Sequence, residues 1–372
     1  MKNKIHKYDF LIIGAGLIGA LMGLELAQKK FKVLVIEKNK QALMDKRTLA
    51  VNANSREFLC SLDLWKDLDN EPIKKIIIQD ELNNIPLEFN HPKEPMGSIV
   101  YNKDLLIRAR RELKKKKILI ENLNIDLEKI KSKTLIKLKY QNYIFNKIII
   151  SVGKNYSQNT SLKKNEFNSK HSSLVGFFNH SLKHDNKAYE IFTKKGPLAV
   201  LPAPNKNKKF STFIYSSKES IGNSELKKIV KKFFYKTHGQ INFIGDFKSF
   251  KITPHLSIST NQDIFLLGDS LRSIHPVAGQ GWNLGVKDIQ TLSNLIEQYG
   301  INDKKIYSIY YSRRKIESFA YLFFTNILNV IYDKSDNKFN KLMINIGFLG
   351  LLKVNLIRKV FIEQAMGRAR LI

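Results

Sequence analysis

A glycine-rich turn near the start of the chain reads Gly14-Ala15-Gly16-Leu17-Ile18-Gly19. It follows a short apolar run, residues 9–13, and opens a segment, residues 17–28, in which small and aliphatic residues recur at helical spacing. A second apolar run, residues 32–37, comes next. The order of strand, turn, helix and strand predicts a βαβ unit in a parallel sheet.

Each glycine of this turn has a steric role in binding a dinucleotide. Gly14 permits a tight turn, Gly16 lets the backbone approach a pyrophosphate, and Gly19 allows close packing of helix on strand. The start of the helix adds unpaired amides and a positive dipole end. Glu37, at the end of the next strand, is placed to bind a ribose diol. The turn predicts a dinucleotide site and leaves NAD and FAD both open.

A second segment, much later in the chain, decides between the two nucleotides. Residues 263–267 predict a short buried strand, and Gly268-Asp269 follows it. The chain then runs Ser273-Ile274-His275-Pro276-Val277-Ala278-Gly279-Gln280-Gly281-Trp282-Asn283-Leu284-Gly285. An acid after a buried strand can bind a ribityl chain, and successive glycines let amides approach a ring edge that gains negative charge on reduction. A helix starting near Asn283 adds its positive end. This pattern favours a flavin.

The remaining sequence predicts the other elements from their apolar periodicity. These are a hairpin over residues 75–90 with its turn at 83–84, a helix over 104–117, a buried strand over 147–152, a polar loop over 157–170 that crosses between domains, strands over 198–202 and 210–216, helices over 224–236 and 283–298, and a helical region over the last seventy residues.

The late segment resembles the flavoprotein aromatic hydroxylases, and within them the ubiquinone-biosynthesis hydroxylase family, whose signature is G-D-x-x-x-x-x-H-P-x-x-G-Q-G-x-N-L-G. Three other segments are also similar to that family. Residues 45–50 resemble its D-x-R stretch, whose arginine, here Arg47, lies by the cofactor. Residues 192–199 resemble its substrate-domain segment, and residues 311–314 its arginine-bearing segment near the C-terminal helices.

The resemblance implies an α/β fold with three parts. An FAD-binding, Rossmann-like three-layer domain takes residues 1–74, 98–160 and 251–300. A mostly β substrate domain takes residues 161–250, joined by the hairpin at 75–97. A C-terminal helical region takes residues 301–372.

The resemblance also implies an activity and a set of site residues. FAD, reduced by NAD(P)H, forms a flavin hydroperoxide with dioxygen and hydroxylates the aromatic ring of a polyprenylated ubiquinone precursor. The flavin carries this chemistry, so no catalytic side chain is assigned, and His275, Pro276 and Gln280 are candidates for the flavin pocket. Trp282 meets substrate or packs in a core, and Lys287 and Asp288 are expected as helix-surface or capping residues. The implied cofactor-binding residues are Gly14, Gly16, Gly19, Glu37, Arg47, Asp269, Pro276, Gly279, Gly281 and Asn283; no metal site is implied.

One departure from the family keeps two alternatives open. The family carries Asp-Gly followed by Ser near the middle of the chain, where this sequence has Val152-Gly153 and then Tyr156. The missing carboxylate bears on the use of NAD(P)H. The alternatives are another flavin reaction on a prenyl or aromatic substrate, such as reduction or halogenation, and a noncatalytic subunit of a biosynthetic complex.

The composition limits the partners and the compartment. A formal net charge of +30 raises nucleic acid or an anionic membrane as partners, but no nucleic-acid motif accompanies the charge, so nucleic acid is an unlikely partner. The single cysteine, Cys60, excludes an intramolecular disulfide and predicts a small buried residue in a reducing compartment. The N-terminus has no secretory h-region, which predicts a cytoplasmic protein.

Contact with the inner face of the cytoplasmic membrane is a further expectation, because the family's substrates carry a polyprenyl tail. Residues 344–352 are too short to span a bilayer. An amphipathic helical region can rest on the surface instead, and packing on the core is the other interpretation. The residues concerned are Phe348, Leu349, Leu351, Leu352, Lys353, Arg358 and Lys359. A ubiquinone-biosynthesis complex is another implied partner.

Overall fold

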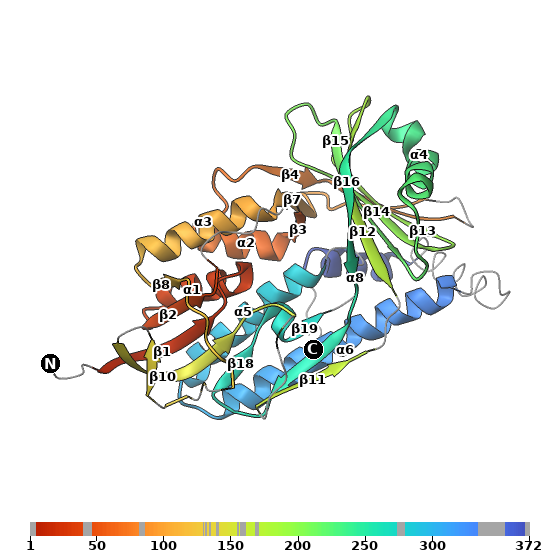
Figure 1. The fold of residues 1–372 in the computed structure, drawn as a ribbon. Coiled ribbons are helices and arrows are strands. Elements are labelled where there is room, and N and C mark those ends of the chain that lie inside the picture. Colours follow the sequence, from red (N-terminus) through yellow and green to blue (C-terminus); the bar gives the residue numbers. More distant parts are fainter. Residues whose placement is uncertain are drawn as a thin grey trace.

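The structure, a computed structural model, describes residues 5–39, 47–81, 86–128, 130, 132–133, 135–138, 141–154, 156, 161–167, 171–273, 280–333 and 354–368. The N-terminal part is built on a parallel sheet with the strand order β18-β10-β1-β2-β8 (Figure 1). Its strands are β1 (Ile5–Ile13), β2 (Val33–Glu37), β8 (Leu119–Glu121), β10 (Gln141–Ile150) and β18 (Ile264–Leu266), and β9 (Ile136–Leu138) pairs antiparallel with β10. The consecutive buried residues at the end of β1 are typical of a parallel strand covered on both faces.

Helices from distant parts of the chain pack on this sheet. The helix α1 (Leu17–Gln28) contacts β1 and β2 and lies against α3 (Asn102–Lys115) and α5 (Gln280–Tyr299). The helix α3 buries Leu105, Leu106, Ala109 and Leu113, which recur at helical spacing. Two more helices, α2 (Ala53–Ser61) and α6 (Lys305–Asp333), contact α5. One core joins all these elements, so the late segment packs beside the glycine turn.

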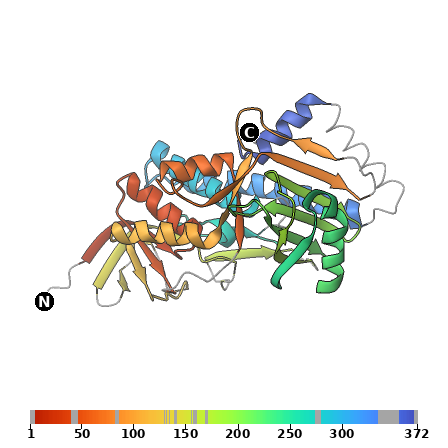
Figure 2. The ribbon, with the colours of Figure 1, turned by 90° about the horizontal axis from the view of Figure 1, so that it is seen from above.

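A second sheet of seven strands, in the order β16-β12-β15-β14-β13-β5-β6, forms the other half of the molecule. The strands are β5 (Lys75–Asp80), β6 (Leu87–Phe89), β12 (Ser172–His180), β13 (Lys187–Thr193), β14 (Gly196–Pro202), β15 (Phe210–Ser217) and β16 (Ile241–Lys251). The helix α4 (Asn223–His238) packs on one face, and α8 (Asn355–Ala365) packs against β5 and β6 (Figure 2).

Two three-stranded sheets complete the described elements. One contains β3 (Thr48–Asn52), β7 (Gly97–Tyr101) and β4 (Asn70–Ile73). The other contains β11 (Leu162–Glu166), β17 (His255–Ser259) and β19 (Arg272–Ser273), and a 3₁₀ turn, η1 (Gly268–Ser270), follows β18. The α/β class, the largely β second half and the helical C-terminal region are confirmed for the described residues. Among the described residues, no helix is long and apolar enough to cross a membrane.

Three expectations from the sequence were wrong. The predicted loop over residues 157–170 contains the strand β11, which pairs antiparallel with β17. The prediction failed because β11 is an edge strand with mostly polar, exposed side chains, and backbone hydrogen bonds hold it in the sheet. Cys60 is exposed, because it lies on the outer face of α2. Asp288 is completely buried instead of lying on a helix surface, because two arginines neutralise it.

Three histidines form a buried cluster where β12 and α4 end in the second half of the molecule. The rings of His180 and His238 lie 4.6 Å apart between centroids, and those of His180 and His184 lie 6.0 Å apart. All three residues are less than 5% exposed. Burial lowers the pKa of His184 to about 4 and that of His238 to about 3. Among the described residues, Nε2 of His184 and Nε2 of His238 have no hydrogen-bond partner.

We expect this cluster to make the protein acid-labile. The unfolded state takes up protons near pH 6.5 while the folded state resists them, so stability is complete above pH 6.5 and falls as pH drops toward 4. The loss is about 1.5 kcal/mol for each of His184 and His238 between pH 6.5 and pH 5. Melting temperatures measured from pH 7 to pH 5 should fall less in His238→Gln than in the wild type. A control variant, His91→Gln, lies outside the cluster; an equal pH dependence in all three proteins would contradict the prediction.

Candidate functional site

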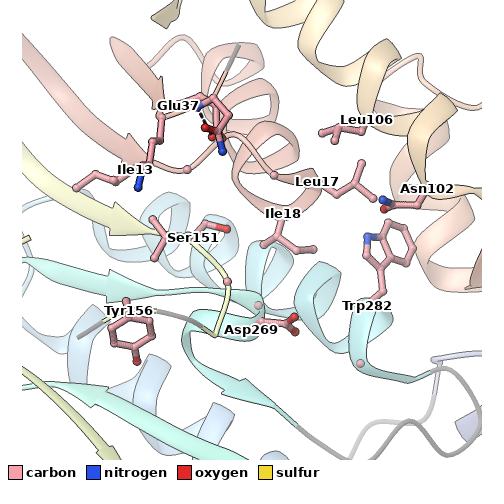
Figure 3. A pocket seen from close by; sticks show the side chains of 18 of the residues that line it. Ile13, Leu17, Ile18, Glu37, Asn102, Leu106, Ser151, Tyr156, Asp269 and Trp282 are labelled. Atoms are coloured by element: carbon pink, nitrogen blue, oxygen red, sulfur yellow. Dashed lines mark hydrogen bonds between the residues drawn. The ribbon is translucent and has the colours of Figure 1, made fainter. Parts of the chain in front are cut away.

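One cavity of about 920 Å³ lies between the parallel sheet and the second sheet. Its wall includes the glycine turn, the end of β2, the turn after β18 and the start of α5, where Leu17, Glu37, Asp269 and Trp282 lie (Figure 3). Leu201 and Ile214 of the second sheet also line it. The volume is at the upper end of the range for ligand pockets. The cavity is therefore large enough for a big cofactor and is shared by elements far apart in the sequence.

The glycine turn has the geometry that the sequence predicts. Gly14 has a φ of +97°, and a Cβ there would lie 2.3 Å from the carbonyl oxygen of Ser151. A Cβ on Gly19 would lie 1.9 Å from the carbonyl oxygen of Gly14, so α1 begins in contact with the turn. Around Gly16, by contrast, no described atom lies within 4 Å of a Cβ position. Gly16 borders the cavity, and among the described residues no side chain caps the N-terminus of α1.

Glu37 lies beside this turn and contacts its backbone. Its Oε2 accepts a hydrogen bond of 2.7 Å from the Ala15 amide and lies 3.2 Å from Nη2 of Arg110. Nε of Arg110 donates to the Ala15 carbonyl oxygen at 2.8 Å. Arg110 thus connects the acid at the end of β2 to the backbone of the turn. Arg110 was not among the residues predicted for the site, although an arginine within the apolar face of a predicted helix was a signal.

Replacing Arg110 with methionine should weaken FAD binding about tenfold, because Glu37 and the turn lose the charged group that connects them. Titration of the FAD-free protein with FAD, followed by flavin fluorescence, measures the change. Arg111→Met is the matched control, since Arg111 is the next residue of α3 and points to solvent. Equal affinities in the two variants would refute this role.

Asp269 faces the cavity from the turn that follows β18. The side chain is accessible from the cavity, whose walls otherwise surround it, and this burial raises the pKa of Asp269. Arg47, Lys154 and Arg272 act in the opposite direction as nearby positive charges. Among the described residues no group donates a hydrogen bond to the Asp269 carboxylate. Asp269 is therefore an open acceptor at the end of a buried strand, as the sequence predicts for a group that binds a ribityl chain.

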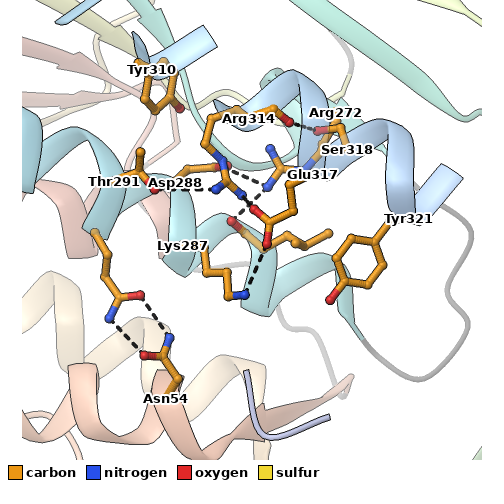
Figure 4. Close-up of polar contacts among 12 residues, drawn as sticks. Asn54, Arg272, Lys287, Asp288, Thr291, Tyr310, Arg314, Glu317, Ser318 and Tyr321 are labelled. Carbon is orange, nitrogen blue, oxygen red and sulfur yellow. Dashed lines mark hydrogen bonds and ion pairs between the residues drawn. The ribbon is translucent and has the colours of Figure 1, made fainter. Parts of the chain in front are cut away.

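A buried ionic network holds the Gly268–Ser270 turn in place (Figure 4). One carboxylate oxygen of Asp288 accepts from the Gly268 amide at 2.9 Å. The other accepts from Nη2 of Arg272 and from Nε of Arg314, each at 2.8 Å. Glu317 pairs with Arg314 and also with Lys287, which lies 3.1 Å away. Asp288 and Lys287 thus act inside the protein, holding α5, α6 and the Gly268–Ser270 turn together.

The other predicted site residues divide into three groups. Arg47 and Gly281 line the cavity with Gly14, Gly16, Glu37 and Asp269. Asn283 is not among the lining residues: its amide nitrogen donates to the Ala50 carbonyl oxygen at 2.9 Å, and its oxygen accepts from the Asn52 amide at 3.1 Å, which joins β3 to α5. His275, Pro276, Gly279 and the side chain of Gln280 lie outside the described residues.

The segment that departs from the family also reaches the cavity. Val152, Gly153 and Tyr156 line it. The hydroxyl of Ser270 accepts from the Val152 amide at 2.9 Å and donates to the Gly153 carbonyl oxygen at 3.1 Å, and the Tyr156 hydroxyl donates to the Ser270 carbonyl oxygen at 2.8 Å. The segment is therefore held to the Asp269 turn without the carboxylate that the family usually carries.

These features fit FAD. The open space at Gly16 and the uncapped start of α1 suit a pyrophosphate. Among the described residues, Nε1 of Trp282 and both Nε and Nη1 of Arg272 are buried donors without a hydrogen-bond partner, and both residues line the cavity. Buried donors without partners are rare in proteins and point to a missing acceptor.

Comparisons with known proteins agree with this assignment. Ubiquinone hydroxylase UbiL of Rhodospirillum rubrum is 22% identical over 391 residues, which cover 98% of this chain and 90% of UbiL. Among solved structures, p-nitrophenol 4-monooxygenase PnpA from Pseudomonas putida superposes with a TM-score of 0.77 at 12% identity, covering 99% of this chain and all of PnpA. The flavin-dependent brominase Bmp2 gives a TM-score of 0.68 at 15% identity, covering 97% and 94%.

The FAD binding domain family matches residues 7–137 and 178–315, more than half of the chain. The two matched ranges contain the glycine turn, Glu37, Arg110 and Asp269, and they also contain Arg272, Asp288 and Arg314 of the buried network. The chain therefore belongs to the FAD binding domain family, and FAD is its cofactor.

Proposed function

We propose that this protein is an FAD-dependent monooxygenase that hydroxylates the aromatic ring of a polyprenylated ubiquinone precursor with NAD(P)H and dioxygen. One observation carries the proposal. A single cavity joins the glycine turn and the Asp269 turn to apolar residues of the second sheet, Leu201 and Ile214. A cofactor bound at the polar end would face an apolar chamber, as a prenylated ring requires.

In this proposal the side chains bind and orient, while bound FAD supplies the activation of dioxygen. Gly14, Gly16 and Gly19 would shape the pyrophosphate site, and the Glu37 carboxylate, which now accepts from the Ala15 amide, would accept from the ribose hydroxyls. Asp269, which lines the cavity, would accept from the ribityl hydroxyls. Arg47 and Gly281 would lie beside the ring, and His275, Pro276 and Gln280, whose side chains lie outside the described residues, stay candidates for the flavin pocket. Asn283 holds β3 against α5. The start of α5 directs its positive end toward the reduced ring.

Three further expectations belong to this proposal: the domain boundaries, contact with a membrane and a biosynthetic complex. The FAD-binding part takes residues 1–74, 98–160 and 251–300, the substrate part 75–97 and 161–250, and residues 301–372 cover the assembly. Contact with the inner face of the cytoplasmic membrane is supported by exposed apolar residues of α8, among them Leu356 and Val360. Arg358 takes no part in that surface, because it packs over Phe89 and donates to the Glu88 carbonyl oxygen. A ubiquinone-biosynthesis complex is the proposed setting.

Halogenation is the second candidate, because the brominase Bmp2 shares the fold. The purified protein loaded with FAD should be given NADPH, ¹⁸O-labelled dioxygen, bromide and 2-geranylphenol, a short-chain prenylated phenol. Mass spectrometry of the product separates the outcomes. One ¹⁸O atom added to the ring supports hydroxylation, and bromine in the ring supports halogenation. If the phenol is unchanged and neither NADPH nor NADH reduces the flavin, the result supports a noncatalytic role.

A further inference from the structure

Glu190 lies in the middle of β13 on the face of the second sheet that is turned away from α4. Its neighbours along the strand, Tyr189 and Ile191, point into the core beneath α4. Because side chains alternate along a strand, Glu190 points to the opposite face. The same face carries Ala188, which packs with Leu201 and with Ala50. Leu201 and Ala50 both line the flavin cavity, so the face of Glu190 is the face that borders the cavity.

The pairing register places Glu190 within reach of the cavity wall. Glu190 pairs with Ala199 of β14, and Ala199 pairs with Ile214 of β15, a residue of the cavity wall. Leu201 lies two residues beyond Ala199 on β14, so it is a diagonal neighbour of Glu190 on the same face. Diagonal neighbours lie roughly 7–8 Å apart, a gap that a long side chain can cross.

The residues directly opposite the carboxyl in the sheet are apolar, and Asp80 is a diagonal neighbour on the same face. The two residues opposite Glu190 in the sheet are Ala199 on one side and Ile78 on the other. Ile78 packs with residues of α8. Among the described residues, Glu190 has no hydrogen bond and no ion pair, and burial alone raises its pKa to about 8. Part of the residue nevertheless stays accessible. Glu190 is not itself among the lining residues, and it lies on the sheet face from which Leu201 and Ile214 line the cavity.

A carboxyl in apolar surroundings without a partner costs stability, since the protein loses its solvation and gains no hydrogen bond. Such groups are concentrated at functional sites. At pH 7 Glu190 is mostly neutral, so it can both donate a hydrogen bond through its hydroxyl and accept one through its carbonyl oxygen. A phenolic hydroxyl, which also donates and accepts and is neutral at that pH, is the matching ligand.

We infer that Glu190 binds the ring hydroxyl of the substrate and thereby sets the position of the ring against the flavin. This inference rests on the proposed function, because it assumes a phenol in the apolar end of the cavity. It makes Glu190 the polar group by which an otherwise apolar chamber selects phenols over aromatic rings without a free hydroxyl. The prenyl tail is left to the apolar residues of the same face.

Two probes that differ by one hydrogen-bond donor test this. The FAD-loaded protein is titrated with 2-geranylphenol and with its methyl ether, and the change in flavin absorbance gives the two dissociation constants. The wild type should bind the phenol about tenfold more tightly than the ether, the effect of one buried hydrogen bond. Glu190→Leu should remove this preference without changing the affinity for FAD, and Glu190→Gln, whose amide also donates and accepts, should keep most of it.

The control is Glu88→Leu, which removes an exposed glutamate of β6 in the same sheet, paired with Lys75, and should bind both probes as the wild type does. An infrared difference spectrum of the wild type needs no variant: the phenol, but not the ether, should shift the carbonyl band of a protonated carboxyl. An unchanged preference in Glu190→Leu, or a wild type that hydroxylates the phenol without preferring it, overturns the inference alone. A wild type that binds FAD but neither probe overturns the proposed function together with it.

Discussion

Replacing Asp288 with asparagine is expected to lower the free energy of unfolding by about 3–5 kcal/mol, the usual loss when one partner of a buried ion pair is removed. Asp288 is completely buried and receives hydrogen bonds from Arg272, Arg314 and the Gly268 amide. Asparagine keeps the size of the side chain and removes its charge. Two buried guanidinium groups then lose their counter-charge, and the turn that bears Asp269 loses a charged acceptor.

The same substitution should release FAD, because the Gly268 amide and the Asp269 side chain belong to one turn. Urea unfolding and the FAD content of the purified protein measure the two effects. Glu297→Gln is the matched control: Glu297 is also an acid of α5 in an ion pair, with Lys29 at 2.6 Å, but its side chain is 57% exposed. Exposed pairs contribute at most about 1 kcal/mol. Similar losses in the two variants would mean that burial of Asp288 has no special role.

Much of the fold was predictable because the decisive signals are local. The glycine turn, the apolar runs on either side of it and the helical spacing of Leu105, Leu106, Ala109 and Leu113 each depend on a few neighbouring residues. The hairpin predicted over residues 75–90 appears as the antiparallel pair β5 and β6. The predicted helices over 224–236 and 283–298 correspond to α4 and α5, which extend slightly further at both ends.

The role of Asp288 was not predictable, because it depends on two arginines that meet it only in the folded chain. Arg272 lies in β19 and Arg314 in α6. The one local sign is that Asp288 lies four residues from both Leu284 and Leu292, on the apolar face of α5. Arg110 is a similar case, since its partners, Ala15 in the glycine turn and Glu37 at the end of β2, lie far from it in the sequence. Long-range ion pairs leave only one weak trace in a sequence, a charged residue within an apolar face.

Edge strands and single exposed residues were the other failures. The strand β11 alternates weakly and carries mostly polar side chains, because only Leu162 faces the core. What makes it a strand is backbone pairing with β17, and that pairing has no signature in the side chains. For Cys60, composition favoured burial, but its position on α2 places it on the solvent side of a short helix.

Replacing Gly19 with alanine is expected to abolish FAD binding and to destabilise the fold, whereas Gly16→Ala should abolish FAD binding alone. A Cβ on Gly19 would lie 1.9 Å from the carbonyl oxygen of Gly14. No side chain can move away here, because the obstacle is backbone, so α1 must shift from the turn and take its amides with it. At Gly16 the φ of −62° suits any residue and no described atom lies within 4 Å of the Cβ position, so the fold tolerates the methyl group.

The space at Gly16 is, however, the space that a pyrophosphate would occupy, and a methyl group there holds the phosphates away from the helix N-terminus. The two variants therefore separate packing from binding: melting temperature falls in Gly19→Ala only, and FAD affinity falls at least about a hundredfold in both, the loss expected when several charge-assisted hydrogen bonds break together. Gly222→Ala is the control, since Gly222 also precedes a helix, α4, with nothing near its Cβ position and lies far from the cavity. Normal FAD affinity in Gly16→Ala would mean that the cofactor's phosphates bind elsewhere in the cavity, because only direct contact makes that open position sensitive to one methyl group.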